Sequence, residues 1–199
     1  MTVKKLSILT FCLFFYSNSW AFWGSTSAND YSKDANSEYY CNDLAGTAVT
    51  TAAGLSPLNP ALTLYNPYGS GKNLVLLDVG IDITAAPAAA AQFMLAYSTA
   101  AGAPTTTTPA QTTSAYINVT STNPVTASTG LCYRAATIPS VPIAFRYLGG
   151  TTGAAAISGV VMTDLTQGKV VVPPGGTISI QSTSAAAIIA HVLWREDPI

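Results

Sequence analysis

The sequence has 199 residues, of which 49 % are hydrophobic and 9 % are charged, and its formal net charge is −1. This length fits one domain with a tail, and the eight basic residues are scattered, which excludes the basic stripe of a nucleic-acid groove. A typical soluble domain is about 25 % charged, so this surface lacks the charge repulsion that keeps cytosolic proteins apart. The composition favours a protein that contacts copies of itself or functions outside the cytosol; the alternative is an Ala/Thr-rich composition without functional meaning.

Residues 1–21 have the features of a secretory signal peptide. Two lysines precede the apolar run "LSILTFCLFFY" (6–16), and Ser19 and Ala21 occupy the −3 and −1 positions of a small-x-small cleavage site. We expect export and cleavage after Ala21, which removes two of the eight basic residues and leaves six against nine acidic ones, a net charge of −3. The alternative is an uncleaved anchor that meets a membrane through residues 6–16, although a transmembrane helix needs about 20 apolar residues.

The three cysteines are consistent with export. Cys12 lies inside the signal and leaves with it, so Cys41 and Cys132 remain as a pair. In an oxidising compartment this pair is expected to form a disulfide, which would stabilise the fold by about 4–5 kcal/mol. The alternative is two buried free thiols.

Residues 22–46 are predicted to form a polar N-terminal arm, with a β-domain following at 47–199. The arm has an excess of acidic residues. It contains four of them, Asp30, Asp34, Glu38 and Asp43, against one lysine, Lys33. Within it, "DANSE" (34–38) places oxygen-bearing side chains like the start of a calcium loop, but Tyr39 stands at the sixth position and Ala45 at the twelfth. We therefore expect no cofactor, and a weak calcium site between subunits is kept as an alternative.

From residue 47 onward, short β-prone segments alternate with turn signals. The segment 85–99 is ambiguous between helix and strand, and 66–71, 101–113 and 122–130 are expected loops. The expected strands are 62–66, 73–83, 114–121, 141–148, 155–162, 169–172, 177–182 and 187–194. Eight or nine short strands without a long amphipathic helix indicate an all-β, two-sheet antiparallel sandwich, and a jelly roll is the preferred topology.

The segment "PPGG" (173–176) is predicted to be a corner between two strands. Pro173 and Pro174 lack the N–H that a strand ladder needs, and Gly175 and Gly176 can take positive φ without steric cost. The segment has no polar side chain, so it is not expected to be a catalytic loop.

Residues that could carry chemistry are few, and we expect no enzyme. The one histidine, His191, lies in a strand pattern without a G-x-S-x-G motif, and the exported chain would offer few zinc ligands. Asp78 and Asp82 would lie about 13 Å apart along a strand, too far for glycoside hydrolysis. "GSGKN" (69–73) is not a phosphate loop, because asparagines replace the required Gly and Ser/Thr.

Two segments resemble small jelly-roll virion structural proteins of tailed phages and related environmental viruses. "LYNPYGSGKNLVLLDVGID" (64–82) is similar to their NPxGSGKNLVL block, and 168–197 is similar to their C-terminal block, in which a PPGG corner precedes a strand ending in Trp and acidic residues. The matching C-terminal positions here are Pro173, Pro174, Gly175, Gly176, Ile180, Trp194, Glu196 and Asp197. The resemblance implies a jelly-roll structural protein without catalytic residues, although a secretory signal departs from a cytoplasmically assembled phage capsid.

The main prediction is a non-enzymatic structural subunit that self-assembles on a particle or cell surface, as a virion capsid, spike or decoration protein. Its expected partners are copies of itself and other virion or surface proteins, and its expected location is extracellular, at the cell surface or at the virion surface. The alternatives are an exported bacterial surface-filament subunit and a carbohydrate-binding or adhesin module, in which Tyr68 or Trp23 could stack on sugars. An enzyme that depends on His191 is the weakest reading.

Overall fold

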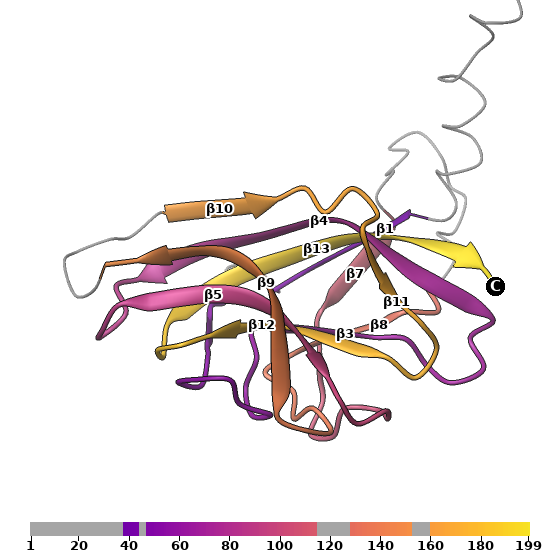
Figure 1. The fold of residues 1–199 in the computed structure, drawn as a ribbon. Coiled ribbons are helices and arrows are strands. Elements are labelled where there is room, and N and C mark those ends of the chain that lie inside the picture. The colour runs from indigo at the N-terminus through magenta and orange to yellow at the C-terminus, as the bar shows by residue number, and fades with distance from the viewer. Residues whose placement is uncertain (1–37, 44–46, 115–127, 153–159) are drawn as a thin grey trace, which may run out of the picture. The chain divides into compact units, whose positions relative to one another are not determined.

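The computed structural model describes residues 38–43, 47–114, 128–152 and 160–199 (Figure 1). Residues 1–37, and with them the predicted cleavage site at Ala21, lie outside the described residues. All described residues belong to one compact unit, Ala35–Ile199. The described part of this unit is built from strands and contains no helix that is long and apolar enough to span a membrane.

One layer, sheet A, follows the order β10-β4-β13-β1-β7, with two further strands, β11 on β4 and β2 on β13. All of its strand pairs are antiparallel, and the longest pairing joins β4 to β13. The bounds are β1 Glu38–Asn42, β2 Val49–Thr50, β4 Lys72–Ala85, β7 Gln111–Ser114, β10 Val160–Asp164, β11 Val170–Val172 and β13 Ala187–Pro198.

The other layer, sheet B, follows the order β6-β8-β3-β12-β5-β9, again fully antiparallel. Its bounds are β3 Leu62–Tyr65, β5 Ala91–Ser98, β6 Thr108–Pro109, β8 Leu131–Arg134, β9 Pro142–Thr151 and β12 Thr177–Ser182. Two antiparallel sheets in layers confirm the predicted all-β sandwich.

The strand order identifies the sandwich as a jelly roll. If β1, β3, β4, β5, β9, β10, β12 and β13 are taken as eight strands in chain order, the first pairs with the last, the second with the seventh, the third with the sixth and the fourth with the fifth. A ribbon of paired strands wrapped in this way forms the two Greek keys of a jelly roll. The remaining strands, β2, β6, β7, β8 and β11, add to the margins of this eight-strand frame.

The core lies between the sheets, and β13 supplies one of its clearest patterns. Its residues alternate between buried and partly exposed from Ile188 to Glu196, as a strand with one face on a core requires. Trp194 is completely buried and stacks on Tyr39 of β1, with ring centroids 5.9 Å apart. Because Trp194 and Tyr39 are large and fully enclosed, β1 is an integral part of the core.

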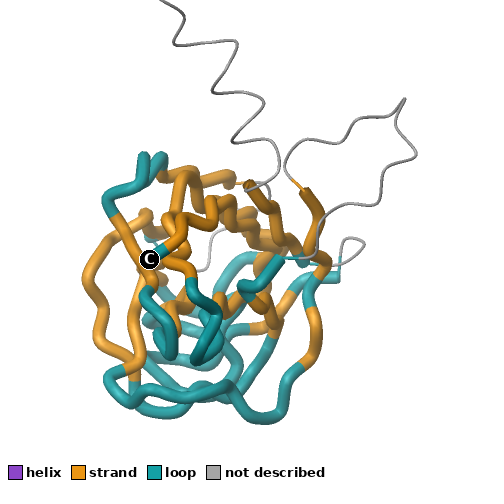
Figure 2. The backbone as a smooth tube through the Cα atoms, turned by 90° about the vertical axis from the view of Figure 1, so that its right-hand side faces the viewer, coloured by secondary structure: helices purple, strands orange, loops and turns teal. Residues whose placement is uncertain are grey.

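Loops cover the outer face of sheet B, so its central strands are buried on both faces. Every residue of β3 and β12 is buried. Chain segments from 51–61 and from the connection between β5 and β9 pass below this sheet, where Figures 1 and 2 show the loops gathered. In that layer the backbone N–H of Ser56 donates to the Gln181 side-chain oxygen, and Leu58 forms an isolated antiparallel β-bridge with Thr137. Polar residues of β12 are therefore enclosed without being part of the inter-sheet core.

Several predicted boundaries need correction. The predicted arm 22–46 ends in strand β1, because Tyr39 and Cys41 point into the core and β1 pairs with β13 on one side and β7 on the other. The expected loop 101–113 contains β6 and most of β7, while the ambiguous segment 85–99 contains strand β5. Strand β8, at Leu131–Arg134, was not predicted. Most of the expected strand 114–121 lies outside the described residues.

Candidate functional site

The predicted corner 173–176 joins β11 to β12, and the chain around Asn66 holds it in place. The buried Asn66 side-chain amide donates to the carbonyl oxygens of Lys72 and Val172, both at 2.8 Å. Its backbone N–H donates to the Gly176 carbonyl at 3.0 Å, and its carbonyl accepts from the Gly175 N–H at 2.7 Å. The segments 64–82 and 168–197 therefore meet in one hydrogen-bonded unit.

Within the corner, only Gly175 takes a positive φ, at 81°. A methyl group added there would overlap the ring of Tyr68, which lies against it. Tyr68 is nevertheless 63 % exposed, so one edge of its ring faces solvent. The corner thus has a packing role, and Asn66, which replaces the glycine of a phosphate loop, serves as a structural hydrogen-bond donor.

Glu196 is a buried carboxylate whose role the sequence did not reveal. Its Oε1 accepts from the backbone N–H groups of Thr129 and Gly130 and from the Ser128 hydroxyl, at 2.7–2.9 Å, and its Oε2 pairs with Lys72 Nζ at 3.1 Å. Burial acts to raise the pKa of Glu196, but the bonds from this loop and from Lys72 outweigh it and hold that pKa below its ordinary value. Glu196 therefore anchors the loop 128–130 to the end of β13.

His191 lies on the outer face of sheet A, as predicted for a sheet-face residue. Its ring stacks on Tyr40, with centroids 5.4 Å apart, and its Nε2 is 3.4 Å from an Asp78 carboxylate oxygen. His191 pairs in register with Gly80, where any side chain would overlap the imidazole. In register, Asp82 pairs with Ile189 and Asp78 with Leu193, on either side of this position. His191, Tyr40, Gly80 and Asp78 therefore form a packed arrangement on this face of the sheet.

No cluster of three or more potential metal ligands occurs among the described residues. Of the calcium-like segment 34–38, only Glu38 is described, and it begins β1. Tyr39, at the sixth position of the supposed loop, is buried in a strand against Trp194, so the chain does not turn there as a calcium loop must. Residues 34–37 lie outside the described residues, so the weak calcium site stays a prediction.

Cys41 and Cys132 form the predicted disulfide, with their Cα atoms 6.5 Å apart. Cys41 is on β1 in sheet A and Cys132 is on β8 in sheet B, so the bond joins the two layers. Nearby, the buried Asp43 accepts from the Ala190 N–H at 3.0 Å, and its other oxygen lies 3.6 Å from Arg134 of β8. This side of the sandwich is thus closed by both a covalent and a polar connection.

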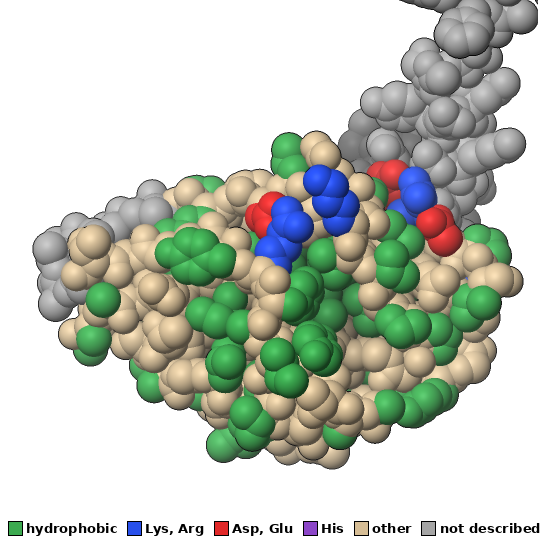
Figure 3. Space-filling view, viewed as in Figure 1, with side chains coloured by type: hydrophobic (Ala, Val, Ile, Leu, Met, Phe, Trp, Pro, Cys, Tyr) green, Lys and Arg blue, Asp and Glu red, His purple; other side chains and the backbone are tan. Residues whose placement is uncertain are grey.

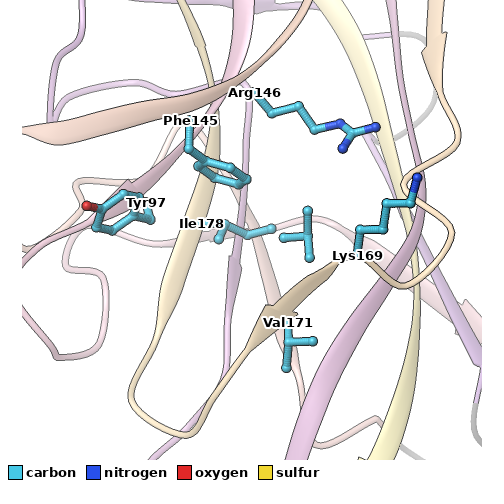
Figure 4. A pocket seen from close by; sticks show the side chains of 7 residues that line it. Tyr97, Phe145, Arg146, Lys169, Val171 and Ile178 are labelled. Atoms are coloured by element: carbon cyan, nitrogen blue, oxygen red, sulfur yellow. The ribbon is translucent and has the colours of Figure 1, made fainter.

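The opposite side has a pocket between the margins of the two sheets, where β9, β10 and β11 each pair with one other described strand. Its volume is about 360 Å³, and it is lined from sheet B by Tyr97, Phe145, Arg146 and Ile178 and from the β11 side by Lys169, Val170 and Val171. Figure 4 shows the cationic ends of Arg146 and Lys169 together at one end, with apolar side chains across the rest. We call this pocket the β9–β11 notch.

A β-bulge shapes the notch. Between the pairs Leu95–Arg146 and Ala96–Ala144, Phe145 has no partner on β5, so it is the extra residue of the bulge. Its ring lies 6.1 Å from that of Tyr97, tilted by 55°. The neighbouring Arg146 forms two hydrogen bonds to Asp164 of β10, and this pairing holds the pKa of Asp164 below its ordinary value. Arg146 and Asp164 thus connect the two sheets at the notch.

The sequence did not indicate the notch, because Tyr97 lies in the ambiguous segment 85–99 and the segment 141–148 was predicted only to be a strand. A weak signal was available in "VPIAFRYL" (141–148), where apolar residues stand at successive positions and one arginine interrupts them. The bulge that directs the Phe145 side chain toward the notch depends on the pairing of β9 with β5. It could not be inferred from the segment 141–148 alone.

Comparisons with known proteins add little to this description. No family model matches the sequence, and no curated protein matches it. Among solved structures, the chain is similar to the VP1 pentamer of human polyomavirus 6, with a TM-score of 0.30 and 8 % sequence identity over 81 % of this chain and 94 % of that chain. A likeness this distant carries no argument about function, and the jelly-roll assignment rests on the strand pairing of this chain.

Proposed function

We propose that this protein is a non-enzymatic structural subunit that assembles with copies of itself on the surface of a particle or cell, as a coat, spike or decoration protein. The observation that carries the proposal is a surface rich in exposed apolar side chains and poor in free charge. Thirteen large hydrophobic residues are exposed in the described part of the chain, and eight of them lie on or beside four strands, β5, β9, β10 and β11. Monomeric soluble proteins rarely expose large contiguous apolar patches without an interaction partner.

The few charged side chains are mostly neutralised within the fold. Among the described residues, ion pairs join Lys72 to Glu196, Arg134 to Asp43, Arg146 to Asp164 and Arg195 to Asp197, and His191 faces Asp78. Charge repulsion between copies is therefore weak, which favours close association. The same use of carboxylates and histidine in packing and loop anchoring supports a role without catalysis.

The virion assignment within this proposal is supported by the sequence blocks 64–82 and 168–197. These blocks resemble virion proteins, and in the structure they form one unit through β4, β11, β13 and Asn66. A resemblance confined to segments that fold against each other is what a shared structural element would produce. Secretion, and with it an extracellular or surface location, rests on residues 1–21 and is part of the proposal.

The test is the assembly state of purified protein in solution. Light scattering and negative-stain microscopy across a concentration series should show oligomers, rings or fibres that grow with concentration. A species that stays monomeric at the highest soluble concentration would refute the structural-subunit proposal.

The second candidate is a carbohydrate-binding module, favoured by the exposed ring of Tyr68 and by the aromatic residues of the notch. Exposed aromatic rings present flat apolar faces of the kind on which sugars can stack. The other suggested aromatic, Trp23, lies outside the described residues. A glycan array with the wild-type protein and a Tyr68→Ala variant decides this candidate, since binding that the variant loses supports it and no binding at millimolar sugar removes it.

A further inference from the structure

The two sides of the sandwich differ in how they are closed. At one side, β1 and β8 are joined by the Cys41–Cys132 disulfide. At the other side, the margins of the sheets are formed by β9 in sheet B and by β10 and β11 in sheet A, and the Arg146–Asp164 ion pair joins them. Exposed apolar residues gather on this second side: Tyr97, Val141, Ile143, Phe145, Tyr147, Val161, Leu165 and Val171.

This side combines exposed aromatic side chains with charged groups around them, as the core of a protein–protein interface does. Phe145 and Tyr97 are 43 % and 41 % exposed, and they form the aromatic wall of the notch, with half-exposed Val171 across from them. Figure 3 shows the corresponding hollow, with hydrophobic side chains on its walls and the Lys and Arg side chains above it. Aromatic residues at the centre with charged groups at the rim are typical of protein–protein contacts.

The free margin of β9 does not favour simple extension of sheet B. Pro142 lacks a backbone N–H, and the bulges at Phe145 and Leu148 interrupt the strand ladder. Bulges of this kind are a known means of preventing edge-to-edge strand pairing while re-aiming a side chain. The contact made here is therefore a side-chain contact through Phe145 and its neighbours.

The charge on this side only weakly opposes contact with a second copy of the same chain. Arg146 is neutralised by Asp164, so Lys169 is the remaining cation of the notch, and it lies at the rim. Two copies that meet through this side bring apolar walls together while a single positive charge from each stays at the margin, where solvent screens it.

The exposed apolar area is also of the right size. Tyr97, Val141, Ile143, Phe145 and Val171 are 41–60 % exposed, and at about 150 Å² for a whole side chain, the lower end of the range for aromatic residues, they present on the order of 350 Å². A standard interface buries about 800 Å² per partner, of which roughly 57 % is apolar. The exposed side chains therefore supply most of the apolar area that one such interface needs.

We infer that the β9–β11 notch and the exposed apolar residues around it are the surface through which one copy of this protein binds a second copy. The inference rests on the proposed function and specifies it, because it assigns the subunit contact to one side of the jelly roll. The Phe145 and Tyr97 rings form the centre of the contact, and Lys169 and the Arg146–Asp164 pair form its rim.

The test compares three single variants of the full chain, produced under oxidising conditions. Phe145→Asp and Val171→Asp each place a charge in the proposed contact, while Leu58→Asp places the same charge at an exposed position under sheet B and serves as the matched control. Sedimentation velocity over a concentration series measures the association constant, and circular dichroism confirms that each variant is folded. We expect both notch variants to weaken association by about tenfold or more and Leu58→Asp to leave it unchanged.

The outcomes separate the location of the contact from the function. If wild-type protein associates and a folded Val171→Asp variant associates as strongly as Leu58→Asp, the contact lies elsewhere and only this inference fails. If wild-type protein does not associate at all, the proposed function fails with it. Should Phe145→Asp not fold, Val171→Asp decides alone, because Val171 is half exposed on a free strand margin.

Discussion

At the scale of single residues, Gly175 shows how the corner after β11 limits the side chains it accepts. Its φ of 81° disfavours any residue with a Cβ, and the ring of Tyr68 occupies the space that a Cβ would need. These are two separate costs, one in the backbone and one in packing, and a second glycine of the same region allows them to be separated.

We expect Gly175→Ala to destabilise the fold more than Gly69→Ala. Gly69 also has a positive φ, of 74°, but nothing lies within 4 Å of an added Cβ there. Gly69→Ala should therefore cost only the backbone strain, about 1–2 kcal/mol, while Gly175→Ala adds a further overpacking cost of about 1–3 kcal/mol. Urea unfolding of the two variants measures the difference, and equal destabilisation would mean that Tyr68 moves away freely.

Glu196 illustrates a residue whose contacts come from distant parts of the chain. Glu196→Gln keeps the size of the side chain but replaces one acceptor oxygen with an N–H donor, which would face the donors of 128–130 or Lys72. Hydrogen bonds to a charged group contribute about 1.5–3 kcal/mol, so we expect a loss of stability of about 2–3 kcal/mol at neutral pH. Unfolding in urea at pH 7 checks this, and a variant as stable as wild type would show that the charge is not needed.

At the scale of elements, the disulfide holds β1 against β8 across the two sheets. Cys41 and Cys132 are separated by 91 residues in the sequence, so the bond closes a long loop in the unfolded chain. By the chain-entropy model, reduction of this disulfide should lower the free energy of unfolding by about 4–5 kcal/mol. We expect a Cys41→Ala/Cys132→Ala variant to lose stability of this order.

Thermal unfolding with and without reductant separates the effect of the bond from that of the side chains. Wild-type protein should lose stability on reduction, whereas the double-alanine variant should not respond. A wild-type midpoint that is insensitive to reductant would contradict the expected contribution of the disulfide.

At the scale of the whole molecule, two buried carboxylates have opposite effects on how stability depends on pH. Burial raises the pKa of Asp43 to about 6, against an ordinary value of 3.8, despite the Ala190 N–H and the nearby Arg134. The folded state therefore binds this proton more tightly than the unfolded state, and stability should fall as pH rises from about 4 to about 6. Glu196 has a lowered pKa and acts in the other direction, contributing stability that is lost as pH falls below its ordinary value of 4.5.

Asp43→Asn should remove the decline in stability between pH 4 and 6. It should leave unchanged the loss of stability at lower pH, which depends on Glu196. The amide oxygen can still accept from the Ala190 N–H, so the change removes the charge and keeps that bond. At one pKa unit per about 1.4 kcal/mol, the effect on the pH profile is on the order of 2–3 kcal/mol. Urea midpoints measured from pH 4 to 8 test this, and a variant that keeps the wild-type slope in that window would assign the slope to another group.

Much of the architecture could be predicted from local sequence. The alternation in 177–182 and 187–194, the β-branched run at 73–83 and the corner 173–176 all identified strands and turns that the structure contains. The strand β1 could not be recognised, because "EYYCN" sits in a polar, acidic stretch and becomes a strand only by pairing with β13 and β7. For the same reason β13 was predicted to end at residue 194, since an inward-facing glutamate at 196 is acceptable only with the loop 128–130 as its partner.

By itself, the sequence determined the β class and the positions of the main turns and predicted the Cys41–Cys132 disulfide, because these depend on side-chain period, on proline and glycine geometry and on cysteine number. The tertiary structure alone decided that one side of the jelly roll is closed by a disulfide and the other is an exposed apolar notch. That difference arises because β9, β10 and β11 come to the margins of two sheets only after strands distant in the sequence have paired.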